Sequence, residues 1–198
     1  MCIKSVREMS DKALFAEVFG VREDTIRFDR IGDLMTAPRA IDGIGERKAD
    51  KIYAVREMAR RIMAQEAQEP EQIHGPQDVA DFLQGRLGYE TREHFMVVVL
   101  DAKNHILAVS DVSIGSLSAS VVHPREVFRE ALKYPVASII LVHNHPSGSA
   151  SPSREDIAVT QRLVKAGKIL DVPVLDHIII GGAGSHKWMS LKEKGFII

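Results

Sequence analysis

The residue types best suited to chemistry are two histidines and one aspartate that flank a loop rich in Gly, Pro and Ser. His143 and His145 follow an apolar run, and Asp156 lies after the loop, where a helix is expected to begin. Residues two apart on an extended chain point to the same side, and a carboxylate in the next helix's first turn can turn back toward them. Two imidazoles and one carboxylate match an open catalytic zinc site with a fourth position for water. The pattern predicts a site for one Zn²⁺.

Each half of this pattern also has a purely structural explanation. Ser153 and Asp156 have the spacing of a capping box variant, in which Ser153 satisfies first-turn N–H groups and the helix dipole favours Asp156. A His-x-His pair at a strand end more often consists of ordinary surface or core histidines. The metal interpretation is favoured because both patterns occur together across one loop.

A zinc site of this type needs a proton acceptor that is not itself a ligand. Glu90 and Glu93 both precede the first apolar strand, and Glu93 lies immediately before its start. We predict that Glu93 takes this role; the alternative is a solvated glutamate at the rim of the site.

Asp176 and His177 lie within a later apolar run. They either orient a ligand imidazole from behind or form a buried polar pair inside the strand, and the sequence leaves both readings open.

Taken together, these residues resemble the JAB/MPN (JAMM) metalloenzyme motif, which consists of a glutamate followed far downstream by His-x-His, seven residues and Ser-x-x-Asp. Further segments are similar to the RadC branch of that superfamily: Arg92-Glu-His-Phe95, His123-Pro-Arg-Glu-Val-Phe128, His143-Asn-His-Pro-Ser-Gly148, Thr160 and Asp176-His-Ile-Ile-Ile-Gly181. The resemblance covers essentially all of residues 75–198.

The resemblance implies that His143, His145 and Asp156 bind zinc, that Glu93 holds and deprotonates the water, and that Ser153 supports the oxyanion. The role of Ser153 rests on the resemblance alone. Enzymes of the wider superfamily cut peptide or isopeptide amides, whereas the substrate of RadC-like proteins is not settled by the resemblance.

These residues must be positioned by alternating strands and helices. We expect strands over 95–100, 106–109, 137–142 and 174–180, and helices over 123–132 and 153–168. The predicted fold class is α/β (α+β), a JAB/MPN-like mixed sheet flanked by helices, over residues 77–198.

Residues 1–67 have a helical pattern instead, with helices expected over 13–19 and 48–63, and a polar segment predicts a linker at 68–76. Residues 41–49 resemble a helix-hairpin-helix motif. Gly43 and Gly45 permit a tight hairpin whose N–H groups can hold a phosphate, and Lys48 and Lys51 add charged contacts, so DNA is a candidate partner. The alternative is a plain turn between packed helices.

The composition limits the partners and the cellular compartment that we expect for this protein. The 198 residues contain 26 Lys+Arg and 27 Asp+Glu, so no overall positive field gathers polyanions. The lone cysteine, Cys2, excludes an intramolecular disulfide and a thiolate cluster and is compatible with a reducing cytosol. The chain lacks a secretory signal pattern and an apolar run of about 20 residues, so we expect a cytoplasmic protein without a membrane span.

The leading hypothesis is a zinc metalloprotease or isopeptidase-like hydrolase with an N-terminal helical module for which DNA is a candidate partner. One alternative is a metal-dependent nuclease or another DNA-processing protein acting in DNA repair, and another is a DNA-binding scaffold with little catalysis. Nucleases favour Mg²⁺ or Mn²⁺ in carboxylate-rich, often paired-metal sites, so the histidine-rich set favours amide hydrolysis.

Overall fold

The computed structural model describes residues 6, 8–27, 38–41, 43–66, 70, 72–115 and 122–197. Contacts between Cα atoms divide the chain into two compact units, Met1–Met63 and Ala64–Ile198. Cys2 and part of the predicted linker, residues 68, 69 and 71, lie outside the described residues.

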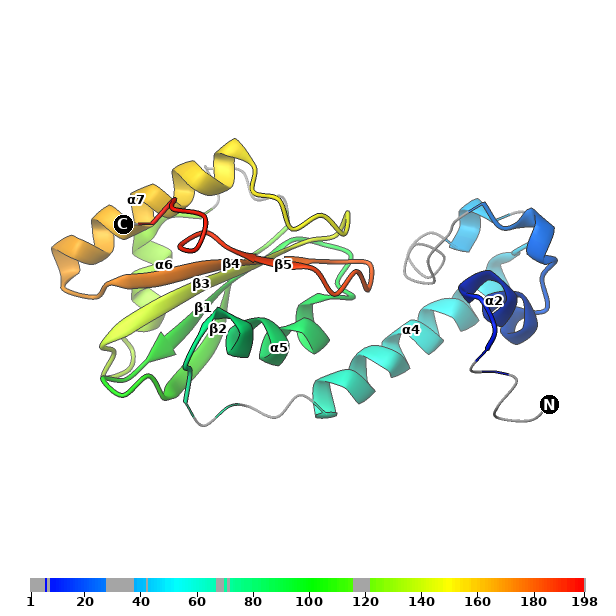
Figure 1. Cartoon of the computed structure of the whole chain (residues 1–198), viewed down its shortest axis with the longest axis horizontal. Helices are drawn as coiled ribbons and strands as arrows, with labels where there is room; N and C mark the ends of the chain where they lie inside the picture. Colours follow the sequence, from blue (N-terminus) through cyan, green and yellow to red (C-terminus); the bar gives the residue numbers. More distant parts are fainter. Residues whose placement is uncertain are drawn as a thin grey trace. The chain divides into compact units, whose positions relative to one another are not determined.

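The second unit is built on a five-stranded mixed sheet with the strand order β2-β1-β3-β4-β5 (Figure 1). Strands β3 and β4 run parallel, whereas the other neighbouring pairs are antiparallel. This arrangement confirms the predicted mixed α/β fold. The strands are β1 (His94–Leu100), β2 (Ile106–Ile114), β3 (Ser138–His145), β4 (Val174–Gly181) and β5 (Trp188–Ser190).

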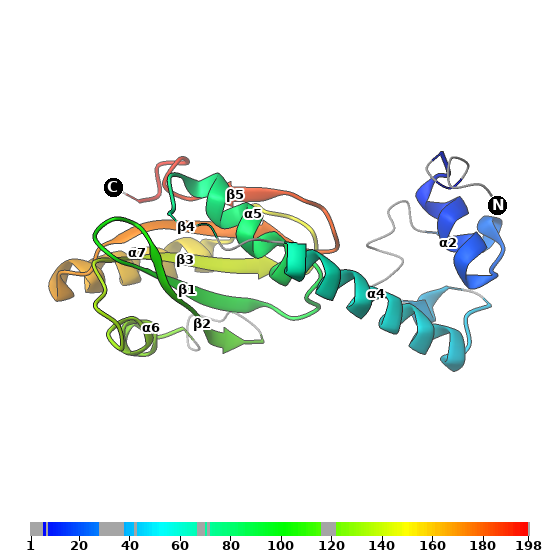
Figure 2. The same ribbon diagram turned by 90° about the horizontal axis from the view of Figure 1, so that it is seen from below.

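Helices cover both faces of this sheet. They are α5 (Pro76–Leu87), α6 (Pro124–Ala131) and α7 (Arg154–Leu170). One core cluster joins α5 to the sheet, and another joins α6 and α7 to it. Figure 1 shows α7 and α5 on opposite sides of the sheet, and Figure 2 shows the same for α5 and α6.

The alternation of side chains along β3 decides which layer receives the histidines. Ile139 and Leu141 pack in the cluster with α6 and α7, whereas Ile140 and Val142 pack in the cluster with α5. Continuing this period places His143 and His145 on the α7 side and Asn144 on the α5 side.

Some predicted boundaries differ from the structure. Strand β3 continues to His145 instead of ending at residue 142, because pairing with β1 extends to His143 and pairing with β4 extends to His145. Strand β2 also extends to Ile114, beyond the expected end at residue 109. Pro76, which the sequence placed in the linker, is the first residue of α5, where its missing N–H costs nothing.

The first unit is helical, as its sequence pattern predicts. Its described elements are α2 (Asp11–Phe19), η1 (Glu23–Thr25), η2 (Pro38–Ala40) and the start of α4 (Glu46–Glu66), which runs past the unit boundary. A small core of its own, including Phe15, Ile41 and Ile52, holds these elements together. Among the helices that the structure describes, none is both long and apolar enough to cross a membrane.

Candidate metal centre

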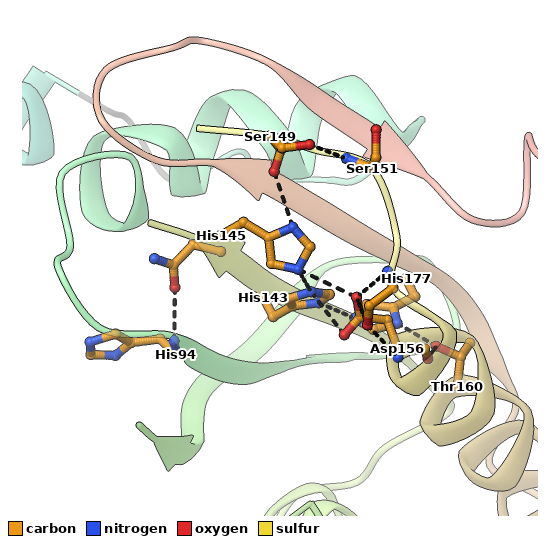
Figure 3. A network of polar contacts seen from close by, with 10 residues as sticks. His94, His143, His145, Ser149, Ser151, Asp156, Thr160 and His177 are labelled. Atoms are coloured by element: carbon orange, nitrogen blue, oxygen red, sulfur yellow. Dashed lines mark hydrogen bonds and ion pairs between the residues drawn. The ribbon is translucent and has the colours of Figure 1, made fainter. Parts of the chain in front are cut away.

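Three side chains converge at the end of β3 and the start of α7 (Figure 3). The Nε2 atoms of His143 and His145 are 3.0 Å apart. Nε2 of His143 lies 3.3 Å from Oδ1 of Asp156, and Nε2 of His145 lies 3.3 Å from Oδ2 of the same carboxylate. Within the described part of the chain, these residues form a group that can hold a metal ion.

The carboxylate of Asp156 also caps its own helix. Ser153 is the N-cap residue of α7, and its Oγ accepts a hydrogen bond of 3.1 Å from the Asp156 N–H. Oδ2 of Asp156 in turn accepts from both N–H and O–H of Ser153, each at 2.7 Å. The capping interpretation and the metal interpretation are therefore compatible, because helix capping holds the carboxylate beside the two imidazoles.

His145 has a fixed tautomer in this arrangement. Its Nδ1 lies 3.0 Å from the carbonyl oxygen of Ser149. A carbonyl oxygen can only accept, so Nδ1 carries the proton and donates it. A neutral His145 ring then presents the unprotonated Nε2 to the other two side chains, which is the form that binds a metal.

Burial and mutual contacts shift the pKa values of all three groups. Burial lowers the pKa of His143, which has no exposed surface. A hydrogen bond with Asp156 raises the pKa of His145. Burial alone would raise the pKa of Asp156, but its interactions with His143 and His145 outweigh burial and hold the pKa well below its usual range. At neutral pH the site thus contains an ionised carboxylate and a neutral His143, as metal binding requires.

Glu93 lies in the wall of an open pocket next to these residues. The pocket has a volume of about 740 Å³ and is lined by Thr91, Arg92, Glu93, Gly115, His145, Pro146 and Ser147. Burial lowers the pKa of His143 and the contact with Asp156 raises that of His145, and the nearby charge of Glu93 makes a smaller contribution that favours the protonated form of each ring. The structure therefore brings the predicted proton acceptor to the metal-site residues, and its catalytic role remains a prediction.

Asn144 holds the backbone on both sides of Glu93, and the sequence analysis did not identify it. Its side chain is fully buried, its Nδ2 donates to the carbonyl of Arg92 at 3.1 Å, and its Oδ1 accepts from the N–H of His94 at 2.8 Å. The residue between the two histidines thus ties the start of β1 to β3. The only sequence signal for this role was an amide side chain between the two histidines.

The loop after His145 packs closely on a pair of glycines. The N–H of Gly182 donates to the carbonyl of His145 at 2.8 Å. A Cβ atom at Gly182 would lie 2.9 Å from the Cα of Pro146, and one at Gly181 would lie 2.7 Å from the carbonyl oxygen of Gly148. No larger residue fits at these two positions without moving the loop that follows His145.

Ser153 is placed for capping in this structure. Ser153 is exposed, and its hydroxyl donates to Oδ2 of Asp156 at 2.7 Å. Support of an oxyanion by Ser153 requires this hydroxyl to turn away from the carboxylate, and that role remains a prediction.

The structure gives different roles to Asp176 and His177, whose function the sequence left open. His177 contacts a ligand candidate, because its Nε2 lies 2.8 Å from Nδ1 of His143. The carboxylate of Asp176 instead accepts from the hydroxyl of Ser190 at 2.6 Å and from the N–H of Lys192 at 3.0 Å. Asp176 also accepts from the backbone N–H of His177 at 2.6 Å, so its carboxylate fastens β4 to the segment around β5. Of the two side chains, that of His177 is the one that contacts a metal-site residue.

The candidate DNA-binding residues lie around the start of α4 in the first unit. Gly43 has a φ of 85°, which favours glycine, and Gly45 directly precedes the helix. Nζ of Lys48 donates to the carbonyl of Gly20 at 3.0 Å, so this charge takes part in packing within the unit, whereas Lys51 is exposed.

The fold and the site define a mixed α/β domain with a His-His-Asp metal-site candidate. The model of the RadC-like JAB domain matches residues 73–196. A UPF0758 protein of Caldanaerobacter subterraneus subsp. tengcongensis is 51% identical over 156 residues, covering 79% of this chain and 66% of the relative. A UPF0758 protein of Bacillus cereus (strain B4264) is 41% identical over 212 aligned positions, covering 100% of this chain and 93% of the relative. The chain belongs to the RadC-like JAB domain family.

Proposed function

We propose that this protein is a zinc-dependent hydrolase of the JAMM type that cleaves peptide or isopeptide amides. The observation that supports this function most is the convergence of two imidazole Nε2 atoms and one carboxylate beside the pocket that Glu93 lines. In this proposal His143, His145 and Asp156 are the ligands of one zinc ion.

The spacing of the three ligand atoms suits one tetrahedral zinc. With zinc–ligand bonds of about 2.0–2.1 Å, ligand atoms of a tetrahedral site lie about 3.3–3.4 Å apart. The separations here are 3.0 Å between the nitrogens, 3.3 Å from Nε2 of His143 to Oδ1 of Asp156, and 3.3 Å from Nε2 of His145 to Oδ2 of the same carboxylate. One ligand atom from each residue lies within 4.8 Å of the other two, so a single ion can contact all three side chains. Histidine nitrogens also favour zinc over Mg²⁺, which prefers oxygen ligands, and this argues against the nuclease alternative.

Glu93 supplies the proton transfers that amide hydrolysis requires. Zinc at this site would polarise the scissile carbonyl and lower the pKa of a coordinated water toward about 7. The carboxylate of Glu93 accepts a proton from the attacking water and delivers it to the leaving nitrogen, which departs as an amine. The open pocket beside His145 gives an extended substrate access to this position.

The test compares wild-type protein with Glu93→Gln in zinc content and in cleavage of a peptide pool and of branched and single-stranded DNA. We expect both proteins to hold one zinc per chain, and only the wild type to cleave peptides. Removal of a general base lowers the rate by about 100-fold or more. Glu155→Gln is the matched control, because Glu155 is an exposed carboxylate in the first turn of α7. Cleavage of DNA that Glu93→Gln abolishes would keep the site but overturn the substrate class.

A further inference from the structure

A chain of buried hydrogen bonds runs from His143 through two residues and returns to Asp156 (Figure 3). Nδ1 of His143 lies 2.8 Å from Nε2 of His177, and Nδ1 of His177 lies 2.6 Å from Oγ1 of Thr160. The hydroxyl of Thr160 donates to the backbone carbonyl of Asp156 at 2.6 Å. His143, His177 and Thr160 have no exposed surface, so water does not compete for these contacts.

The positions of the protons along this chain follow from its two ends. A His143 ring that binds metal through Nε2 keeps its proton on Nδ1 and donates it to Nε2 of His177. His177 then carries its own proton on Nδ1 and donates it to Oγ1 of Thr160. The single hydroxyl proton of Thr160 goes to the carbonyl of Asp156, which can only accept. Each proton has one acceptor, and no group in the chain is left unsatisfied.

We propose that His177 and Thr160 are positioning residues that hold His143 in the tautomer and ring orientation that present Nε2 to the metal. This inference rests on the zinc site of the proposed function. The chain begins at one proposed ligand and ends on the backbone of another, so it couples the positions of His143 and Asp156.

The two histidine ligands differ in what holds them. The carbonyl of Ser149 sets the tautomer of His145 directly, because it can only accept. The neighbour of His143 is another histidine, which can accept or donate at Nε2 depending on its own tautomer. Thr160 is needed to complete the chain, because it gives the Nδ1 proton of His177 an acceptor.

The first experiment measures zinc affinity by competition with a chromophoric chelator in wild type, Thr160→Val, Thr160→Ser and His177→Phe. Partners of metal ligands contribute about 10–100-fold to metal affinity. We expect a loss of about 10-fold in Thr160→Val, a larger loss in His177→Phe, and near wild-type affinity in Thr160→Ser, which keeps the hydroxyl. Wild-type affinity in both Thr160→Val and His177→Phe would overturn the inference.

Ser190→Ala is the matched control for a general loss of buried polar contacts. Ser190 is buried and bonds Asp176, which neighbours His177 in β4. This variant should lower the melting temperature of the zinc-free protein and leave the zinc affinity unchanged. An equal loss of affinity in Ser190→Ala and Thr160→Val would overturn the positioning role, because the effect would then follow stability alone.

A second measurement does not depend on the folding of any variant. Nitrogen-15 NMR of the histidine rings in zinc-loaded wild type should show His177 with a protonated Nδ1 and a bare Nε2. The opposite tautomer would overturn the inference and leave the zinc hydrolase proposal standing. Zinc binding with the expected tautomer but without hydrolysis would have the reverse meaning, since it contradicts the hydrolase and retains the positioning residues.

Discussion

The metal centre and the segment around Gly43 and Gly45 were both predicted from residue types and spacing, yet their polar groups are held in different ways. At the metal centre, His143 and Asp156 are buried and hydrogen-bonded. In the other segment the two glycines are exposed, and Lys48 bonds a carbonyl of its own unit.

This difference shows that burial of the polar groups decides how strongly a sequence pattern supports a function. Buried polar and charged groups are costly unless they are paired, so a His-His-Asp cluster in which His143 and Asp156 are buried is not explained by packing alone. Exposed glycines before a helix are also what an ordinary turn contains. The metal assignment therefore draws on the structure as well as the sequence, whereas nucleic-acid binding must be decided by experiment.

Replacement of Asp156 by Ala should have the largest effect on zinc binding and stability of the variants proposed for the two regions. The variant loses a proposed zinc ligand together with the carboxylate that accepts from the N–H and O–H of Ser153 in the capping box of α7. We expect no stoichiometric zinc by elemental analysis and a lower melting temperature. Glu155→Ala, one residue earlier and exposed, should keep full zinc. A full zinc complement in Asp156→Ala would remove this residue from the ligand set.

Acidification should release zinc, and the shifted pKa values set the order in which its proposed ligands are protonated. The pKa of His145 is raised by its contact with Asp156, whereas the pKa of Asp156 is lowered. As the pH falls, His145 is therefore protonated before Asp156, and the proton competes with zinc for Nε2. Zinc affinity, measured by chelator competition over a pH series, should begin to fall at the raised pKa of His145. An affinity that stays constant until carboxylates titrate would contradict this order.

Asn144→Ala should separate metal binding from catalysis. The variant loses the hydrogen bonds that hold the backbone beside Glu93, and a small misplacement of a catalytic group costs about 10-fold or more in rate. We expect unchanged zinc content and a reduced kcat. Val142→Ala is the control, because Val142 is buried on the same face of β3 and its truncation lowers stability alone. Equal kcat values for Asn144→Ala and Val142→Ala would show that the hydrogen bonds of Asn144 do not matter for catalysis.

Gly45→Val should have the smallest effect and tests the first unit. Gly45 has room for a side chain, with no atom within 4 Å of its Cβ position, so the unit should stay folded. If the segment holds a phosphate at the start of α4, the added side chain should weaken DNA binding a few-fold in a low-salt titration, with zinc content unchanged. Identical DNA affinity would leave the turn as a packing feature.

The parts of the site that follow local rules could be predicted from the sequence. The strand period places His143 and His145 on one side, and the capping pattern places Asp156 in the first turn of α7. The contacts of Asn144 could not be predicted, and the choice between the two roles considered for His177 could not be made, because both depend on the register of β3 with β1 and β4. Helix α5 was not predicted because the Gly-Pro pair at its start read as linker, and β5 has only three residues.

The most direct test of the central claim is X-ray absorption at the zinc edge, with zinc stoichiometry, on the wild-type protein. The account predicts one zinc per chain with two imidazole nitrogens and oxygen ligands, and zinc–nitrogen bonds of about 2.0–2.1 Å. Absence of bound zinc, sulfur ligation, or a second metal at about 3.5–4 Å would contradict it.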